Sequence, residues 1–273
     1  MNKILKIEGI KTLNYKTFKT IIILHAILYL LVILIASSIK VHVQGLTIEK
    51  VFQFPHIWNT AAWFASWFNL LLGILAITLI SNEFSFRTFR KQLIDGLSRN
   101  ELLFGKVSVL IFLAAYTMLL VFITGLLFGL IKTPSSSLAD FVNGLSFLPI
   151  LYVQALGYML LAMLFAFIFR NTAFSIVAFI LYFFPIEPII RAFLPSVVKP
   201  FMPVKLISNL TPMPDFVGIS LSEVVQFSSD EFAGNVFGIT TTQAPLFTTT
   251  LAAIGYCILF VFISKLIVQK KNF

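Results

Sequence analysis

The sequence predicts an all-α integral membrane protein with six transmembrane helices in a single domain, residues 1–273. Of these residues, 59% are hydrophobic and only 11% are charged, whereas a soluble domain carries roughly 25% charged residues. The 31 phenylalanines and the long leucine and isoleucine runs suit helices that face lipid, because a transmembrane β-barrel would show short alternating segments. Six apolar runs are expected to span the membrane, at about residues 20–39, 60–80, 107–131, 148–169, 172–184 and 244–268.

The distribution of basic residues predicts the orientation of the chain. Six spans place both chain ends on one side, and that side receives 14 of the 20 lysines and arginines. Basic residues accumulate on the cytosolic side, so we expect cytosolic termini and a location in a bacterial inner or plasma membrane. The net charge of +9 is then a topology signal, and we expect no nucleic-acid binding.

The N-terminal segment, Asn2–Thr20, intersperses five lysines among isoleucine and leucine. This pattern is typical of a helix that lies in the membrane interface, with lysine stems reaching the headgroups. The first span follows it. His25 in that span is interpreted as a hydrogen-bonded residue that faces the bundle.

The second and fourth spans carry the side chains that are candidates for a translocation path. These are Trp63, Trp67, Asn69 and Gln154. Polar residues in spans face other helices or a cavity. For Asn69, a hydrogen bond between helices is the favoured role.

The segment Ser81–Lys106 is the one long polar segment with clear helical order between apolar runs. On a helical period its apolar residues form one stripe and its charged residues another. The apolar stripe is Phe86, Phe89, Leu93 and Leu97, and the charged stripe is Arg87, Lys91 and Asp95. Gly96 suits a left-handed helix end, and Ser98 with Glu101 matches a capping box that starts the next helix. We interpret this segment as a docking element; an ordinary solvated loop helix is the alternative.

The segment Phe184–Met213 contains six prolines but is too apolar for a solvated loop. This proline density predicts that the fifth span ends at Phe184 and that no continuous helix follows. Short helices that dip into the outer leaflet are expected instead. Glu187, Asp230 and Glu231 are interpreted as solvated loop carboxylates.

The chain lacks the patterns of a membrane enzyme. The predicted spans contain essentially no carboxylate, and neither a zinc-protease nor a serine-hydrolase motif is present. The nearest match to a phosphate-binding loop, Asn100–Val107, lacks its first glycine and the Ser/Thr after Lys106. We therefore expect no catalytic residue, metal or cofactor in this chain, and any ATP hydrolysis in a separate one.

The sequence resembles the membrane subunit of type-2 ABC exporters. The resemblance rests on an ordered set of residues after the second span: Glu83, Arg87–Thr88, Gly96–Leu97–Ser98–Arg99 and Gly105–Lys106. A second match, Pro203–Leu210, precedes the last span. Arg87 stands where many members carry glycine, which leaves the role of that position open.

The resemblance implies a permease dimer, here a homodimer, with two cytosolic ABC ATPase subunits that bind ATP and magnesium. It implies an elbow helix at Asn2–Thr20, a coupling helix within Ser81–Lys106 and an extracytoplasmic re-entrant pair in the proline-rich segment. The second and fifth spans would line the path. The residues expected to couple to the ATPase are Glu83, Phe86, Arg87, Phe89, Arg90, Lys91, Asp95 and Arg99.

Two geometries are open for the apolar stripe. It inserts into a groove of the ATPase, or it packs under the bundle and presents Arg87, Lys91 and Asp95 to the ATPase. In both, Glu83 and Arg99 hold the helix to its flanks.

Two other function classes remain open at the level of sequence. An autonomous channel or carrier predicts polar residues in several spans, and these are scarce. A force-transmitting or assembly complex without substrate passage is favoured by large soluble domains, which are absent from this sequence. For an exporter, the aromatic and uncharged second span favours an amphipathic or lipidic substrate. Membrane lipid is a further expected partner.

Overall fold

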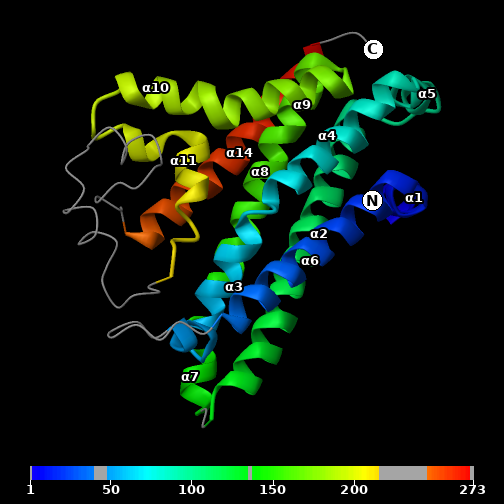
Figure 1. Ribbon diagram of the computed structural model, residues 1–273. Coiled ribbons are helices and arrows are strands. Elements are labelled where there is room, and N and C mark those ends of the chain that lie inside the picture. The colour runs from blue at the N-terminus through cyan, green and yellow to red at the C-terminus, as the bar shows by residue number, and fades with distance from the viewer. Residues whose placement is uncertain (1, 40–47, 135–136, 215–244, 271–273) are drawn as a thin grey trace.

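The computed structural model describes residues 2–39, 48–134, 137–214 and 245–270, all in helices and short connections, with no strand among them (Figure 1). Ser135, Ser136, Asp230 and Glu231 lie outside these ranges. The helices, in chain order, are α1 (Asn2–Asn14), α2 (Lys16–Ser38), η1 (Ile48–Phe52), α3 (Ile57–Ser66), α4 (Asn69–Ser85), α5 (Thr88–Ile94), α6 (Arg99–Lys132), α7 (Leu138–Val142), α8 (Phe147–Phe169), α9 (Thr172–Leu181), η2 (Tyr182–Ile186), α10 (Glu187–Phe193), η3 (Lys199–Phe201), α11 (Pro203–Ser208) and α14 (Leu246–Lys270).

Five helical stretches in the described residues are long and apolar enough to cross a membrane. They are Lys16–Ser38, Arg99–Lys132, Leu138–Phe169, Thr172–Phe193 and Leu246–Lys270. A sixth span results if α3 and α4, which meet at an angle of 45°, are counted as one. The all-helical membrane class is therefore confirmed.

The second span, expected at about residues 60–80, is bent between α3 and α4. The amide of Trp67 donates to the carbonyl of Phe64 at 3.3 Å, and that of Phe68 to Ala65 at 3.1 Å. These i to i−3 bonds tighten the backbone into a 3₁₀ turn, which interrupts the α-helical ladder and redirects the chain.

The fifth span continues past Pro185, so the prediction that it ends at Phe184 is wrong. Helix α9 passes into the π turn η2, which contains Pro185, and then into α10, which ends at Phe193. A π turn shifts the hydrogen-bond pattern, so the missing proline N–H does not break the helix. Pro188 lies in the first turn of α10, where proline is tolerated. Short helices do follow in the proline-rich segment, as η3 and α11.

Glu187 is buried, so its interpretation as a solvated carboxylate is wrong. Its side chain is 1% exposed. Oε2 accepts a hydrogen bond from the amide of Val204 at 2.9 Å, and Oε1 accepts one from the amide of Lys205 at 2.7 Å. The carboxylate thus satisfies the first free amides of α11 and joins that helix to the start of α10.

Helix α8 is the centre of the bundle. It packs against α4, α6, α9 and α14, and most of its side chains are buried (Figure 1). It is apolar on all sides, which is typical of a helix surrounded by others. The main hydrophobic core gathers along its length.

One end of the bundle brings together α1, α5 and the last turn of α14, whereas α7 lies at the other end (Figure 1). We call the first of these the terminal end. The interfacial helix expected at Asn2–Thr20 is shorter, because Tyr15 is extended (φ −79°, ψ 120°) and ends α1 at Asn14. Residues from Lys16 onward belong to α2.

Candidate functional site

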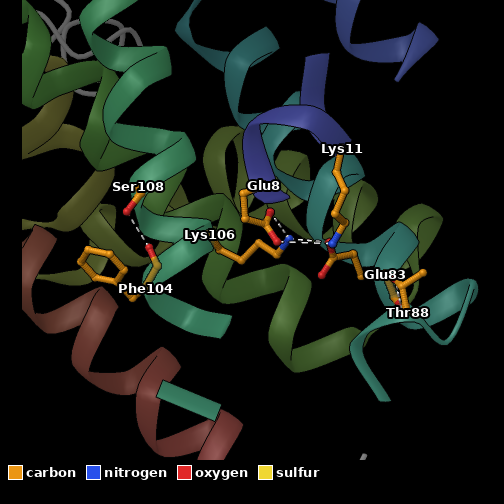
Figure 2. A network of polar contacts seen from close by, with 7 residues as sticks. All are labelled: Glu8, Lys11, Glu83, Thr88, Phe104, Lys106 and Ser108. Carbon is orange, nitrogen blue, oxygen red and sulfur yellow. Dashed lines mark hydrogen bonds and ion pairs between the residues drawn. The ribbon is translucent and has the colours of Figure 1, made fainter. Parts of the chain in front are cut away.

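Four charged side chains form an ion-pair network at the terminal end, which we call the ionic cluster (Figure 2). Its members are Glu8 and Lys11 of α1, Glu83 of α4 and Lys106 of α6. The ammonium of Lys106 pairs with Glu8 at 2.5 Å and also with Glu83. Lys11 pairs with Glu83 and, at 3.3 Å, with Glu8. Two carboxylates and two ammonium groups balance, as buried charges require.

Gly105 lets α1 approach α6 closely enough to build the cluster. A Cβ at this position would lie 3.0 Å from Cγ of Glu8 and 3.1 Å from a methyl group of Ile4. Both distances are shorter than ordinary van der Waals contact, so a larger residue here would force the side chains of Glu8 and Ile4 to shift. The motif Gly105–Lys106 therefore supplies both the space and the charge for the contact.

The charges of the cluster hold its two members from α1, Glu8 and Lys11, in their ionised forms. Burial alone would raise the pKa of the Glu8 carboxyl, but Lys106 and Lys11 outweigh it, and the pKa lies below its ordinary value. Burial would lower the pKa of Lys11, but Glu83 and Glu8 outweigh it, and this pKa is raised. Glu8 and Lys11 are thus both ionised at neutral pH.

A second polar contact joins α4 to the α1–α2 corner and to α9. Asn82 donates from Nδ2 to the hydroxyl of Tyr15 at 2.6 Å and accepts at Oδ1 from Thr172 at 3.2 Å. A cavity of about 190 Å³ lies between this contact and the ionic cluster. Glu83 lines it, and its buried Oε2 has no hydrogen-bond partner among the described residues.

The connection from α4 to α5 turns sharply at Arg87, which adopts the left-handed conformation (φ 54°, ψ 18°). Glycine reaches this conformation at little steric cost, which explains why it is common at this position in the proteins that the chain resembles. The turn separates Phe86 from α5, so the expectation of one stripe from Phe86 to Leu97 is wrong. Phe86 is 72% exposed, whereas Phe89 is 1% exposed.

Helix α5 is packed against the terminal end of the bundle through Phe89. Its ring stacks on Phe84 with centroids 5.2 Å apart and meets Phe167 edge to face at 6.4 Å. Leu93 and Leu97 are partly buried against the same core. Phe89, Leu93 and Leu97 thus pack against the bundle as in the second expected geometry, whereas Phe86 does not.

The opposite face of α5 points away from the bundle. The exposed residues of this face and its flanks, which we call the α5 surface, are Phe86, Arg87, Arg90, Lys91, Ile94 and Asp95. Ile94 is 76% exposed. A surface with two large apolar side chains among basic ones has the composition of a protein-binding site.

The junction between α5 and α6 follows the predicted local pattern. Gly96 has a φ of +93°, and Ser98 and Glu101 form the capping box at the start of α6. Arg99 donates to the carbonyls of Val268, at 3.2 Å, and Gln269. This contact attaches the start of α6 to the last turn of α14.

Two of the four path candidates contact each other in the bundle interior. The amide of Asn69 donates to Oε1 of Gln154 at 3.4 Å, and Gln154 donates to the carbonyl of Ile207 and to Thr211. These bonds link α4, α8 and α11, which agrees with the favoured helix-to-helix role of Asn69. The other two candidates, Trp63 and Trp67, pack edge to face at the bend after α3, and Trp67 is exposed.

The sequence analysis missed Glu8, which pairs with Lys106 from 98 residues away along the chain. One signal was available: Glu8 is the single acidic residue among the first 48, and it precedes Lys11 by one helical turn. Nothing in the local pattern identifies its distant partners.

The arrangement of α1, α4, α5 and α6 can now be compared with known families. A sequence model described as ABC-2 family transporter protein matches residues 4–186. The chain belongs to the ABC-2 transporter family. The match covers well over half of the chain, from α1 to η2, and includes the ionic cluster and α5. A search of curated proteins found no match. This ABC-2 protein is thus a multi-pass permease subunit, and its family implies an ABC ATPase as a partner.

Proposed function

We propose that this permease forms a homodimer that pairs with two separate ATPase subunits and exports an amphipathic or lipidic substrate from the cytosol. Both termini and α5 then face the cytosol of a bacterial cell. The observation that carries the proposal is the arrangement of α5. Its apolar side is packed under the bundle by Phe89, while the α5 surface leaves Phe86 and Ile94 exposed beside Arg90 and Lys91.

The contacts around α5 support a coupling role. The hydroxyl of Thr88, at the start of α5, donates to the carbonyl of Glu83 at 3.3 Å. The side chain of Glu83 enters the ionic cluster, which joins α4 to α1 and α6. A displacement of α5 by a moving ATPase would therefore reach three helices through polar and ionic contacts. ATP and magnesium would bind to the ATPase and not to this chain.

The proposed substrate class rests on the lining of the second span. Trp63 and Trp67 form an aromatic pair with centroids 4.7 Å apart at the bend between α3 and α4. No charged residue lies in either helix before Glu83. A path beside this surface suits an apolar or amphipathic molecule better than an ion.

Coexpression with the cognate ATPase tests the proposal. Copurification is expected to give two copies of each chain. Ile94→Ser should weaken the complex by a factor of about ten to a hundred, because burial of an apolar anchor contributes roughly 1.5–3 kcal/mol. Arg90→Glu with Lys91→Glu should also weaken it, because these two basic residues of the α5 surface then carry the opposite charge. Leu138→Ser, which changes an exposed leucine of α7 at the opposite end, is the matched control. Unchanged binding of both α5 variants, or an active complex with one permease copy, would refute the proposal.

A further inference from the structure

A surface groove of about 390 Å³ runs between α6, α8 and α14. Helices α6 and α14 each pack closely on α8 but contact each other less. Leu160 and Cys257 are buried, at its floor, while Ile111 and Phe262 are exposed, at its rim. All its lining residues are uncharged except one.

The charged lining residue is Lys265, near the terminal end of α14. About one turn further on, the contact of Arg99 with the carbonyl of Val268 joins α6 to α14. Lys265 has no ion-pair partner within the described residues. The groove thus has an apolar body and a single cation at the end nearest the membrane surface.

The length of the groove fits within one lipid leaflet. Seven residues separate Lys265 from Ile258, a rise of roughly 10 Å along the helix, whereas the hydrocarbon core is about 30 Å thick. An unpaired lysine in such a groove requires an anionic partner or must reach the headgroup layer. Both requirements are met by a molecule with an acyl chain and an anionic head.

We infer that this groove binds an anionic glycerophospholipid of the leaflet next to the chain termini. The acyl chain lies over Leu160 and Cys257 between Ile111 and Phe262, and the phosphate accepts hydrogen bonds from Lys265. The site is separate from the α5 surface and needs no ATPase, so it stands or falls independently of the proposed function.

Native mass spectrometry of the full chain in detergent tests the site, with phosphatidylglycerol and phosphatidylcholine of identical acyl chains as probes. One lysine near a membrane surface favours an anionic headgroup about fivefold, so wild type should bind phosphatidylglycerol about fivefold more tightly. Lys265→Gln should remove the preference, and Lys265→Arg should keep it. Lys270→Gln, on the same helix but outside the groove, should also keep it.

Phosphatidylglycerol with a diazirine in its acyl chain locates the binding. Adducts are expected on peptides of α6 and α14 that line the groove, and Lys265→Gln should reduce them to the level of the phosphatidylcholine analogue. Three results would overturn the inference: equal binding of the two lipids by wild type, an equal loss of the phosphatidylglycerol preference in Lys265→Gln and Lys270→Gln, or adducts spread evenly over all helices.

Discussion

At the scale of single residues, charge and backbone conformation decide the geometry of the terminal end. Arg87 holds a left-handed turn that points α5 under the bundle. Lys106 is buried between two carboxylates from different helices. Each residue has a function in the fold that its type alone does not indicate.

Replacement of Arg87 by glycine should leave the melting temperature unchanged or raise it. A left-handed conformation costs a non-glycine residue roughly 1–2 kcal/mol, which offsets the larger entropy loss of glycine. Arg90→Gly, in α5 itself, should lower stability by about 1 kcal/mol. Thermal unfolding in detergent measures the stability of both variants. A larger loss of stability for Arg87→Gly than for Arg90→Gly would show that the arginine side chain, and not the backbone conformation, is what position 87 contributes to stability.

Replacement of Lys106 by methionine should destabilise the protein by about 3–5 kcal/mol, because it leaves Glu8 and Glu83 buried with only Lys11 between them. The double variant Lys106→Met with Glu8→Gln should be more stable than the single one, since it leaves one buried carboxylate, Glu83, for the one remaining ammonium group, Lys11. If the two changes were simply additive in thermal unfolding, Glu8 and Lys106 would not be coupled.

The ionic cluster also predicts a dependence of stability on pH. The pKa of Glu8 is lowered from 4.5, so its contribution is complete above pH 4.5 and disappears as the pH falls through the lower folded value. The pKa of Lys11 is raised from 10.5, so its contribution is complete below pH 10.5 and disappears above the raised value. Wild type should therefore unfold at a higher temperature than Glu8→Gln at neutral pH, and this difference should shrink below pH 4.5. A difference that is constant with pH would contradict an ionised Glu8.

At the scale of elements, α5 shows how one short helix has two distinct faces. Phe89 contacts Phe84 and Phe167 and attaches the helix to the bundle. The α5 surface faces outward. With only seven residues, this helix is too short to be stable alone, so its position depends on the packing of Phe89.

Phe86 and Phe89 form a matched pair for testing these two faces. Phe89→Ala should destabilise the packing of α5 by about 3–5 kcal/mol, since it leaves a cavity between Phe84 and Phe167. Phe86→Ala should have little effect on stability, because that ring is exposed. Hydrogen exchange of α5 amides compares the variants, and equal protection in both would show that Phe89 does not anchor the helix.

At the scale of the whole molecule, α5 and α7 lie at opposite ends of the bundle (Figure 1). The contacts of Arg99 with α14 and of Lys106 with α1 place both described chain ends beside α5. The excess of basic residues on that side supports the proposal that it faces the cytosol.

Thiol labelling of intact cells tests this orientation. In a background with Cys257 replaced by serine, cysteines are placed at Ile94 on α5 and Leu138 on α7, both highly exposed. An impermeant reagent added outside should label position 138 and leave position 94 unmodified until the cells are opened. The reverse pattern would invert the topology and remove the ATPase from reach of α5.

The sequence by itself determined the features that depend on local patterns. Long apolar runs identify helical spans because lipid offers no hydrogen-bond partners to the backbone. The backbone N–H and C=O groups must then bond to each other, as they do in a helix. The capping box of Ser98 and Glu101 and the left-handed Gly96 were predictable because their partners lie within four residues.

Only the tertiary structure decided the features that join distant residues. Glu8 meets Lys106 across 98 positions, and Glu187 caps a helix that begins 16 residues later. The bend at Trp67 and the π turn at Pro185 were also not predicted from the sequence, since an apolar run has the same composition whether its helix is straight or bent. From the sequence alone, a charged residue near an apolar run is interpreted as solvated. Whether it is buried and paired depends on how the helices pack and not on its neighbours in the chain.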